Sequence, residues 1–329
     1  MGNRQEGGDP GQQGADNGHK DQWKGRQVLL TGGTGSFSQA FAQHLLGTNA
    51  ERIVIYSRGE HAQEAMARRL GNGRIRYFIG DVRDRKRLEL AMRGIDAVIH
   101  AAALKVVPIA EYNPTECIAT NVGGAENVVM AAIAAGVKKV IALSTDKAVN
   151  PINLYGASKL CAEKIFIAAN NLSAGKTLFA VVRYGNVVGS QGSVLPLFKK
   201  IAAEGGSLPI TDTRMTRFWI KMDEAIALVN LAHREMKGRE IFIPKIPSIN
   251  ILDLAEAITD KWHLCGIRPG EKLHEVLISE EESCYVTDYN GYYIIYQSGK
   301  PRQATGAYAS NTNPKFLTKE QLKVMMTDG

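Results

Sequence analysis

Two short runs of this chain bring together side chains that can move protons. Residues 144–147 read Ser-Thr-Asp-Lys and follow an apolar run that predicts a strand, and Tyr155 and Lys159 lie four residues apart in the helix predicted next. A phenol with an ordinary pKa near 10 is a poor base at neutral pH, so a cation that lowers this pKa would let Tyr155 take a proton from an alcohol. Alone, such a pair is more typical of a solvated helix face, so the interpretation depends on its surroundings.

A glycine-rich turn near the start of the chain supplies this context. Residues 25–31 predict a short apolar strand, and a helix is expected to open at Ser36 and continue through Leu45. Glycines between them allow a tight bend and a close approach of the backbone to a pyrophosphate, which the amino end of the helix stabilises. This order of elements predicts a dinucleotide site, with contacts from Gly32, Gly33, Thr34, Gly35, Ser36 and Phe37.

The alternation of strands and helices predicts the fold class. After the glycine turn, strands are expected at residues 52–57, 74–79, 97–102, 139–143 and 178–184, with helices between them. This pattern predicts an α/β protein with a Rossmann-like, doubly wound parallel sheet. From Asn186 the elements shorten and prolines become frequent, so a smaller C-terminal substrate-binding subdomain is expected. The predicted division is a disordered leader at 1–22, a dinucleotide-binding domain at 23–185, and the substrate subdomain with the C-terminal tail at 186–329.

Composition and charge narrow the class further. The 329 residues are 44% hydrophobic, enough to bury a full α/β core and a smaller second unit. The net charge is +7, but the 40 basic and 33 acidic residues are interspersed, so no nucleic-acid partner is expected. The N-terminus lacks the apolar core of a signal peptide and no apolar run approaches the roughly 20 residues that span a bilayer, so no membrane insertion is expected.

Cysteine and histidine spacing argues against a metal or a disulfide framework. The four cysteines lie far apart, and no His-x-x-x-His pair occurs. We therefore expect no metal and a cytoplasmic location.

The end of the second predicted strand bears on the choice of cofactor. No acidic residue stands there to bind ribose hydroxyls, and Ser57-Arg58 follows instead, a pair suited to a 2′-phosphate. NADP is therefore favoured over NAD. Asp81, followed by Val82, could hold the adenine edge, or it could be a helix N-cap.

Two loops in the second half carry arginines that could clamp a diphosphate. Arg217 and Arg268 have the geometry for bidentate phosphate contacts, and Glu271 could accept hydrogen bonds from ribose hydroxyls. By themselves these residues would more often be ordinary surface side chains.

Several motifs together resemble those of extended short-chain dehydrogenase/reductases. They are Thr-Gly-Gly-Thr-Gly-Ser-Phe at 31–37, Ala-Ala-Leu-Lys ending at 105, Glu-Tyr-Asn-Pro ending at 114, Leu-Ser-Thr-Asp-Lys-Ala at 143–148, Asn-Leu-Tyr-Gly-Ala-Ser-Lys ending at 159, Arg-Tyr-Gly-Asn-Val-Val-Gly at 183–189 and Ile-Arg-Pro-Gly-Glu-Lys-Leu-His-Glu ending at 275. More narrowly, they resemble the configuration-inverting UDP-N-acetylglucosamine 4,6-dehydratases of pseudaminic acid biosynthesis. The likeness covers roughly residues 25–297 and is specific, because Asp146-Lys147 stands where configuration-retaining relatives carry Asp-Glu.

The resemblance implies a reaction and a role for each residue. UDP-N-acetylglucosamine would lose water between carbons 4 and 6 with inversion at carbon 5, giving UDP-2-acetamido-2,6-dideoxy-beta-L-arabino-hex-4-ulose. Tyr155, assisted by Lys159 and Thr145, would take the proton of the carbon 4 hydroxyl during transient oxidation by bound NADP. Lys147, its pKa lowered by burial or neighbouring cations, would remove the carbon 5 proton, and Asp146 in its acid form would protonate the departing carbon 6 hydroxyl.

The resemblance also completes the predicted binding sets. To the cofactor set it adds Ala101, Ala103 and Asn121, with Tyr155 and Lys159 themselves. The predicted substrate set is Lys105, Asn186, Arg217, Arg268 and Glu271. The expected partners are a UDP-sugar and further copies of the chain in a homo-oligomer.

Four positions depart from the family pattern: Ser38 replaces the third glycine of the turn, and Gly59, Val106 and Gln191 replace polar residues. We expect Ser38 to be tolerated, and the other three to affect affinity or sugar choice more than reaction type. Two other functions stay open at this point. One is a related NADP-dependent sugar-nucleotide dehydratase or epimerase for capsule or O-antigen sugars, which Lys147 argues against because an epimerase needs no base for carbon 5. The other is a catalytically silent dinucleotide-binding module, which has no need of the full proton-handling set.

Overall fold

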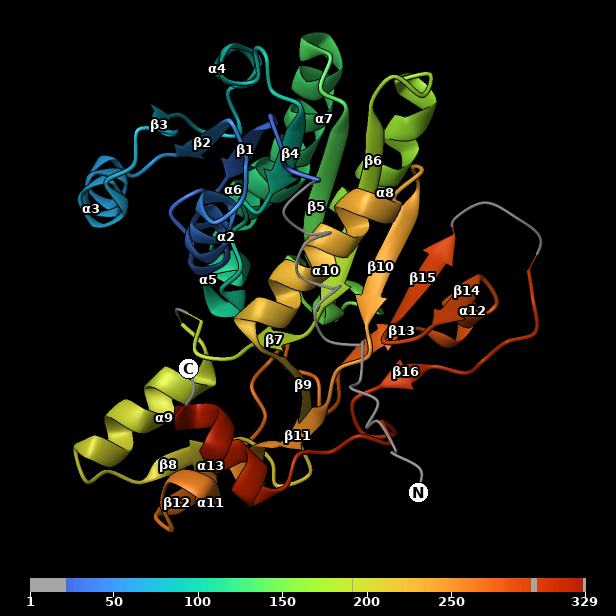
Figure 1. Ribbon diagram of the computed structural model, residues 1–329. Coiled ribbons are helices and arrows are strands. Elements are labelled where there is room, and N and C mark those ends of the chain that lie inside the picture. The colour runs from blue at the N-terminus through green and yellow to red at the C-terminus, as the bar shows by residue number, and fades with distance from the viewer. Residues whose placement is uncertain (1–21, 191, 297–300, 328–329) are drawn as a thin grey trace, which may run out of the picture.

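The computed structural model describes residues 22–190, 192–296 and 301–327, and its centre is a nine-stranded sheet (Figure 1). The strand order is β14-β15-β10-β6-β5-β4-β1-β2-β3. From β10 to β3 the strands are parallel, and β15 and β14 extend this sheet in antiparallel pairing. The bounds are β1 Gln27–Thr31, β2 Arg52–Ser57, β3 Ile75–Ile79, β4 Ala97–His100, β5 Lys139–Thr145, β6 Leu178–Tyr184, β10 Glu240–Pro244, β14 Val286–Tyr289 and β15 Tyr292–Tyr296. The predicted doubly wound parallel sheet is confirmed.

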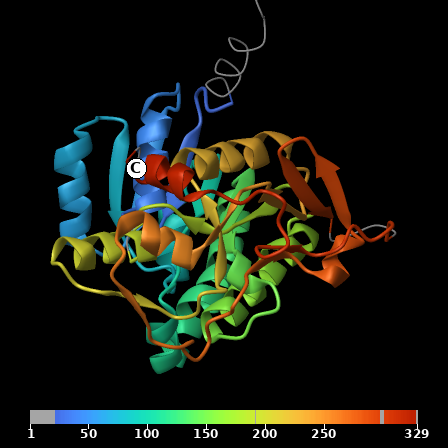
Figure 2. The same ribbon diagram turned by 90° about the horizontal axis from the view of Figure 1, so that it is seen from below.

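Helices cover both faces of this sheet, which explains why its central strands are almost entirely apolar (Figures 1 and 2). On one face α2 packs with α10, and on the other α4, α7 and α8 pack side by side. The bounds are α2 Ser36–Leu46, α3 Glu60–Leu70, α4 Arg85–Ala91, α7 Gly124–Ala135, α8 Leu154–Leu172 and α10 Met222–Glu235. Because the chain leaves β1 toward β2 and returns to β4 on its other side, a crevice opens at the carboxyl ends of β1 and β4, where such folds bind dinucleotides.

A smaller unit has an apolar core of its own, which includes Leu195, Phe198, Trp219, Leu254 and Leu322. Its elements are β8 Leu208–Ile210, α9 Val194–Ala203, α11 Ile251–Ile258, β12 Trp262–Leu264 and α13 Lys319–Thr327, with the sheet of β7 Asn186–Val187, β9 Thr216–Ile220 and β11 Ser248–Asn250 beside them. The predicted boundary at 185/186 is where the chain first leaves the large sheet. However, β10, β14 and β15 return to that sheet, so residues 186–329 contribute to both units.

Two stretches concern the predicted leader and the membrane. Residues 1–21 of the predicted leader lie outside the described residues, whereas Gln22 begins a turn and Trp23 is fully buried, with Nε1 donating to Asn230 Oδ1 at 2.9 Å. Within the described ranges, the stretch Pro114–Ala135 is long and apolar enough to cross a bilayer by length and composition. It comprises α6 Pro114–Ile118, η1 Ala119–Gly123 and α7; half of its apolar window is buried, and α7 packs against α4 and α8, as is typical of a core helix.

A buried arginine ties the long helix α8 to the sheet. Arg183 on β6 is 1% exposed and donates to Glu163 of α8 through Nε at 3.0 Å and Nη2 at 2.6 Å. It also donates to Glu282 of α12 (Glu280–Ser283) at 2.8 and 2.9 Å and to the carbonyl of Leu277 at 2.9 Å. One cation therefore compensates the charges of two carboxylates and fixes the position of α8 along β6.

Replacing Arg183 by leucine should destabilise the fold strongly, because two carboxylates would remain without their buried cation. We expect Arg183→Leu to lower the free energy of unfolding by about 3–5 kcal/mol in equilibrium urea denaturation. The matched control is Arg214→Leu, whose exposed pair with Asp212 should contribute less than about 1 kcal/mol. Equal effects of the two substitutions would contradict this account.

Candidate active site

The glycine turn after β1 fits a dinucleotide because side chains are excluded from it. Gly32 has a φ of +61°, and a Cβ there would lie 2.9 Å from Ala102 Cα; a Cβ on Gly33 would lie 2.6 Å from Ile55 Cγ2. The N-cap of α2 is Gly35, and no side chain of the described residues caps this helix. The turn and Thr34, Ser36 and Phe37 thus present a backbone cradle and a positive helix end to a pyrophosphate.

The predicted adenosine contacts lie together at the ends of β2 and β3. Arg58 Nη1 is 3.9 Å from Asp81 Oδ2, and Arg83 Nη2 forms an ion pair with the same oxygen at 2.7 Å. Burial would raise the pKa of Asp81, but the hydrogen bonds from Arg83 outweigh burial and lower it. The N-cap of α4 is Asp84 and not Asp81, so the N-cap alternative for Asp81 is wrong. Ser57 is buried and its Oγ accepts from Gln63 at 3.0 Å. Val82, which follows Asp81, is buried in the turn between β3 and α4.

Asn121 organises the loop after β4. It lies in the π-helical turn η1; its Nδ2 donates to Leu104 O at 3.0 Å and Ser158 Oγ at 2.9 Å, and its Oδ1 accepts from Leu104 N at 2.8 Å. Ala101 N lies 3.2 Å from Thr31 Oγ1, and Ala101 and Ala103 are half-buried. Asn121 therefore fixes the loop that carries these alanines to α8.

The predicted proton-handling residues meet where β5 ends and α8 begins. β5 ends at Thr145, the short turn η2 spans Asp146–Ala148, and Asn153 caps α8 by accepting from Gly156 N at 2.8 Å. The two segments are in close contact, since a Cβ on Gly156 would lie 2.1 Å from the carbonyl oxygen of Lys147. Thr145 is hydrogen-bonded to Tyr155 and donates to Asp146 Oδ1 at 2.9 Å. Asp146 is fully buried, and its Oδ2 lacks a hydrogen-bond partner among the described residues.

Burial dominates the acid–base properties of Tyr155 and Lys159. It raises the pKa of Tyr155 to about 12, although the charge of Lys147 and the hydrogen bond from Thr145 act in the opposite direction. The expected net lowering of this phenol pKa is therefore wrong for the free protein. Burial also lowers the pKa of Lys159 to about 8, partly offset by Glu163.

Lys147 lies between two carboxylates. Its Nζ is 3.1 Å from Asp146 Oδ1 and 3.2 Å from Glu275 Oε1. Burial would lower the pKa of Lys147, but the two negative charges outweigh it and raise the pKa above the ordinary lysine range. The expectation of a lowered pKa is wrong because it considered burial and neighbouring cations without the second carboxylate. Glu275 was not predicted as a site residue; its only signal was its place at the end of a family-like run.

The predicted substrate residues divide into two groups. Arg217 was predicted in a loop but lies in the strand β9. It is mostly buried, donates to Thr216 O at 2.7 Å, and places Nε 3.8 Å from Glu275 Oε1, so it joins the cluster around Lys147. The loop from Arg268 to Glu271 lies against the start of α8, because Asn153 Nδ2 donates to Gly270 O at 2.7 Å.

The remaining predicted substrate residues are either exposed or have buried acceptor atoms. Arg268 is exposed, with Nη1 3.9 Å from Glu271 Oε1, and Lys105 is exposed just after β4. Asn186 Oδ1 and Glu271 Oε2 are buried acceptors without a hydrogen-bond partner in the described part of the chain. Such atoms are suited to the hydroxyl or amide donors of a nucleotide sugar.

The positions that depart from the family pattern occupy ordinary places in the fold. Ser38 is buried within α2, Gly59 precedes α3 as its N-cap, and Val106 is the exposed N-cap of α5 (Val107–Tyr112). Gln191 lies outside the described residues.

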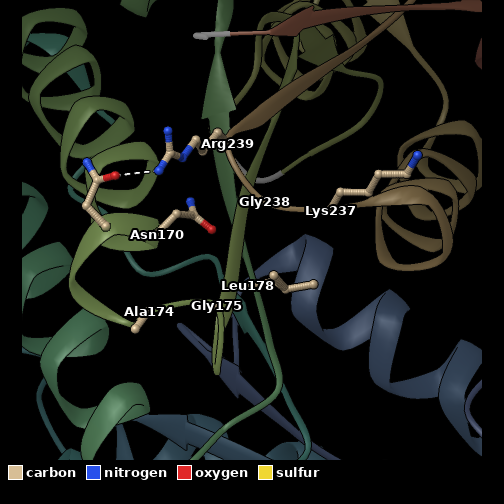
Figure 3. A pocket seen from close by; sticks show the side chains of 8 residues that line it. Asn170, Ala174, Gly175, Leu178, Lys237, Gly238 and Arg239 are labelled. Carbon is tan, nitrogen blue, oxygen red and sulfur yellow. Dashed lines mark hydrogen bonds between the residues drawn. The ribbon is translucent and has the colours of Figure 1, made fainter.

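A hollow elsewhere on the molecule is not part of this site. A pocket of about 410 Å³ is lined by residues around the start of β6, including Asn170, Leu178 and Arg239 (Figure 3). It lies at the amino end of β6, whereas the catalytic residues lie beyond the carboxyl end of β5. Within the described ranges, no three His, Cys, Asp or Glu side chains are grouped to hold a metal ion.

Comparisons with known proteins agree with this geometry. The family described as "Polysaccharide biosynthesis protein" matches residues 28–297. The UDP-N-acetylglucosamine 4,6-dehydratase (inverting) of Campylobacter jejuni subsp. jejuni serotype O:23/36 is 49% identical over 323 residues, covering 91% of this chain and 97% of that protein. The UDP-glucose 4-epimerase of Rickettsia akari is 44% identical over 286 residues, 84% of each chain. The X-ray structure of Pen from Bacillus thuringiensis superimposes with a TM-score of 0.88 at 36% identity, over 93% of this chain and 98% of that one.

Adding one methyl group to the glycine turn should impair dinucleotide binding. In Gly33→Ala the new Cβ would collide with the Ile55 side chain and the Leu30 carbonyl, so the cradle must shift. We expect the dissociation constant for a nicotinamide dinucleotide, measured by calorimetry, to rise by about tenfold or more, equivalent to about 1.4 kcal/mol. Gly73→Ala is the matched control, because nothing lies within 4 Å of its added Cβ, and it should bind like the wild type. Unchanged affinity in Gly33→Ala would exclude this turn as the cradle.

Proposed function

The chain belongs to the polysaccharide biosynthesis protein family, and we propose that it dehydrates UDP-N-acetylglucosamine between carbons 4 and 6 with inversion at carbon 5. The observation that carries the proposal is the cluster in which Tyr155, Thr145, Asp146 and Lys147 meet, because it provides one base for an alcohol and a separate acid–base pair. The likeness to the Campylobacter jejuni enzyme supports it. The product is UDP-2-acetamido-2,6-dideoxy-β-L-arabino-hex-4-ulose.

A nicotinamide dinucleotide is the cofactor that suits the glycine turn. When bound, this cofactor would supply a two-electron oxidation at carbon 4 and a matching reduction at carbon 6, so the overall dehydration needs no external oxidant. The chain would hold its pyrophosphate on Gly32–Ser36 and its ribose near Arg58. We favour NADP because β2 ends in Ser57 and Arg58, and an arginine there can pair with a 2′-phosphate.

The first proton transfer falls to Tyr155. Its phenol is protonated at neutral pH in the free protein, because burial raises its pKa to about 12. The positive charge of Lys147 and the hydrogen bond with Thr145 favour its anionic form, so both assist Tyr155 in taking the proton of the carbon 4 hydroxyl. The resulting ketone acidifies the hydrogen on carbon 5.

The second pair of transfers falls to Asp146 and Lys147. Across 3.1 Å, one proton can pass from Lys147 Nζ to Asp146 Oδ1, which turns an ion pair into a neutral amine and a carboxylic acid. The amine then takes the carbon 5 proton, and the acid gives its proton to the leaving carbon 6 hydroxyl, which departs as water. Afterwards the pair is again an ammonium and a carboxylate. Inversion requires that carbon 5 is reprotonated on the opposite face.

A 4-epimerase is the second candidate, and the similarity to the Rickettsia akari protein favours it. Epimerisation at carbon 4 needs a base for the hydroxyl, a role that Tyr155 can fill. Epimerisation gives no role to the cluster of Lys147 with the buried carboxylates of Asp146 and Glu275. The cluster therefore favours the dehydratase.

Proton NMR of the protein with NADP and UDP-N-acetylglucosamine in deuterated water tests the proposal directly. We expect a new methyl signal, deuterium at carbon 5, and the couplings of an L-arabino 4-keto sugar. D-xylo couplings would instead mean retention, and conversion of UDP-N-acetylglucosamine to its carbon 4 epimer without a methyl product would mean epimerisation. Either result, or no turnover, would overturn the proposed function.

Removing the Lys147 amine should separate the two stages. In Lys147→Ala we expect formation of the methyl product to fall by about 10²–10⁴-fold, because the base for carbon 5 is lost. Oxidation at carbon 4 should persist at a lower rate, since Tyr155 remains but loses the assisting charge of Lys147, and it can be followed by the near-ultraviolet absorbance of the reduced nicotinamide. The exposed Lys200→Ala serves as the control and should turn over normally. Normal methyl formation in Lys147→Ala would remove this residue from the mechanism.

The charge of Lys159 should set an alkaline limit to the oxidation step. Its pKa of about 8 means that it is cationic below this pH and neutral above it, so the oxidation rate should fall as the pH rises through about 8. Lys159→Arg keeps the charge at every accessible pH, so its profile should lack this fall even where its rate is lower. A pH profile measured by stopped-flow absorbance checks both, and the same fall in both proteins would contradict the assignment.

A further inference from the structure

Glu275 is a buried carboxylate that reaches Lys147 from the other half of the chain. It lies just before β13 (Val276–Ile278), is 2% exposed, and has both backbone groups bonded to Ser310: its N donates to Ser310 Oγ at 2.9 Å, and its carbonyl accepts from Ser310 N at 2.8 Å. Ser310 Oγ in turn lies 2.7 Å from Thr216 Oγ1. The backbone of Glu275 is therefore fixed independently of the turn η2 that carries Lys147.

Its two carboxylate oxygens are used differently. Oε1 lies 3.2 Å from Lys147 Nζ and 3.8 Å from Arg217 Nε. Oε2 lies 4.0 Å from Lys272 Nζ and has no hydrogen-bond partner among the described residues. Lys272 Nζ is itself held by the carbonyl of Val149 at 2.5 Å. The closest contact of Glu275 is thus with the amine to which the carbon 5 chemistry is assigned.

A second carboxylate at this place needs an explanation. The proton exchange between Lys147 and Asp146 requires only those two residues, and burying another charge carries a desolvation cost. Asp146 also precedes Lys147 in the same turn, so it cannot fix the amine relative to residues of the substrate-binding half. A lysine stem has four flexible carbons, and an amine that must reach one carbon of a sugar gains from an anchor on the far side.

We propose that Glu275 is a positioning residue for Lys147: it holds Nζ opposite Asp146, joins η2 to the segment before β13, and keeps the amine protonated until the proton passes to Asp146. As regards catalysis, this inference rests on the proposed function. The contact itself does not, so the two can be tested separately.

The substrate-free test is the titration of Lys147 in Glu275→Gln. Competitive acetylation of amines at a series of pH values, read by mass spectrometry with Lys200 as internal reference, gives the apparent pKa of Lys147. We expect it to fall by about one to three pH units, because one of two neighbouring negative charges is lost. The other charged or titratable groups around the pair are unchanged in this variant: Asp146, Tyr155, Arg217, Lys272 and His274. Glu240→Gln is the matched control, a buried carboxylate on β10 that accepts from backbone N–H groups at 2.8 and 2.9 Å.

The test with substrate distinguishes positioning from charge. In Glu275→Gln, the kcat for deuterium incorporation at carbon 5 should fall about tenfold or more, with little change in KM. The fall of this rate at alkaline pH should begin at a lower pH than in the wild type. Glu275→Asp restores the charge but not the reach, so it should recover most of the Lys147 pKa while kcat stays low. Because Glu275→Asp keeps the buried charge, it also tests the proposal if the Gln variant does not fold.

The outcomes separate the two levels. An unchanged Lys147 titration in Glu275→Gln, or wild-type exchange at carbon 5 in both variants, would overturn the positioning role. If the wild type does not convert UDP-N-acetylglucosamine but the titration shift is found, the proposed function fails while the control of Lys147 by Glu275 stands.

Discussion

The structure of the active site depends on one half-buried ammonium held between two buried carboxylates. Charges taken out of water destabilise a protein unless they are paired closely, so Lys147 requires Asp146 and Glu275 at about three ångströms. Asp146 comes from the turn after β5, whereas Glu275 comes from a segment that β16 (Tyr308–Ala309) pairs into place. The ion pair between Lys147 and Glu275 therefore couples the turn η2 to the C-terminal part of the chain. The site is complete only when both parts are folded.

A second buried ion-pair cluster, around Arg183, stabilises the helix α8, which contributes Tyr155 and Lys159 to the active site. Arg183 pairs with Glu163 on the same helix that presents Tyr155 and Lys159, and Glu163 also favours the charged form of Lys159. The helix is thus fixed by a charge at its centre and by contact with η2 at its amino end. The rigidity of α8 and the electrostatics of the site follow from the same buried groups, which limits the substitutions that the helix tolerates.

Local patterns predicted the parts of the fold that local interactions determine. The strands β1, β2, β4, β5 and β6 were predicted because both of their faces are covered and their sequences are nearly all apolar, and the glycine turn because only glycine fits beside Ala102. The pKa of Lys147 was predicted in the wrong direction because the negative charges of Asp146 and Glu275 together raise it, and Glu275 is distant in sequence and lies outside any periodic pattern. The return of β10 to the large sheet was missed for a related reason: it depends on pairing with β6, which a loosened local pattern does not reveal.

The comparisons place two activities, dehydration and epimerisation, on closely similar chains, and the structure indicates where such chains can diverge. Taking a proton from a sugar hydroxyl needs only the residues around Tyr155, which both reactions share in principle. The dehydration needs a base that gains a proton from carbon 5 and an acid that gives a proton to the carbon 6 hydroxyl. The two groups must lie close enough to exchange one proton. Asp146 and Lys147 meet that requirement at 3.1 Å because they are neighbours in one short turn. Under the proposed mechanism, a change at position 147 alone would therefore alter the reaction while the fold and the cofactor cradle stay the same.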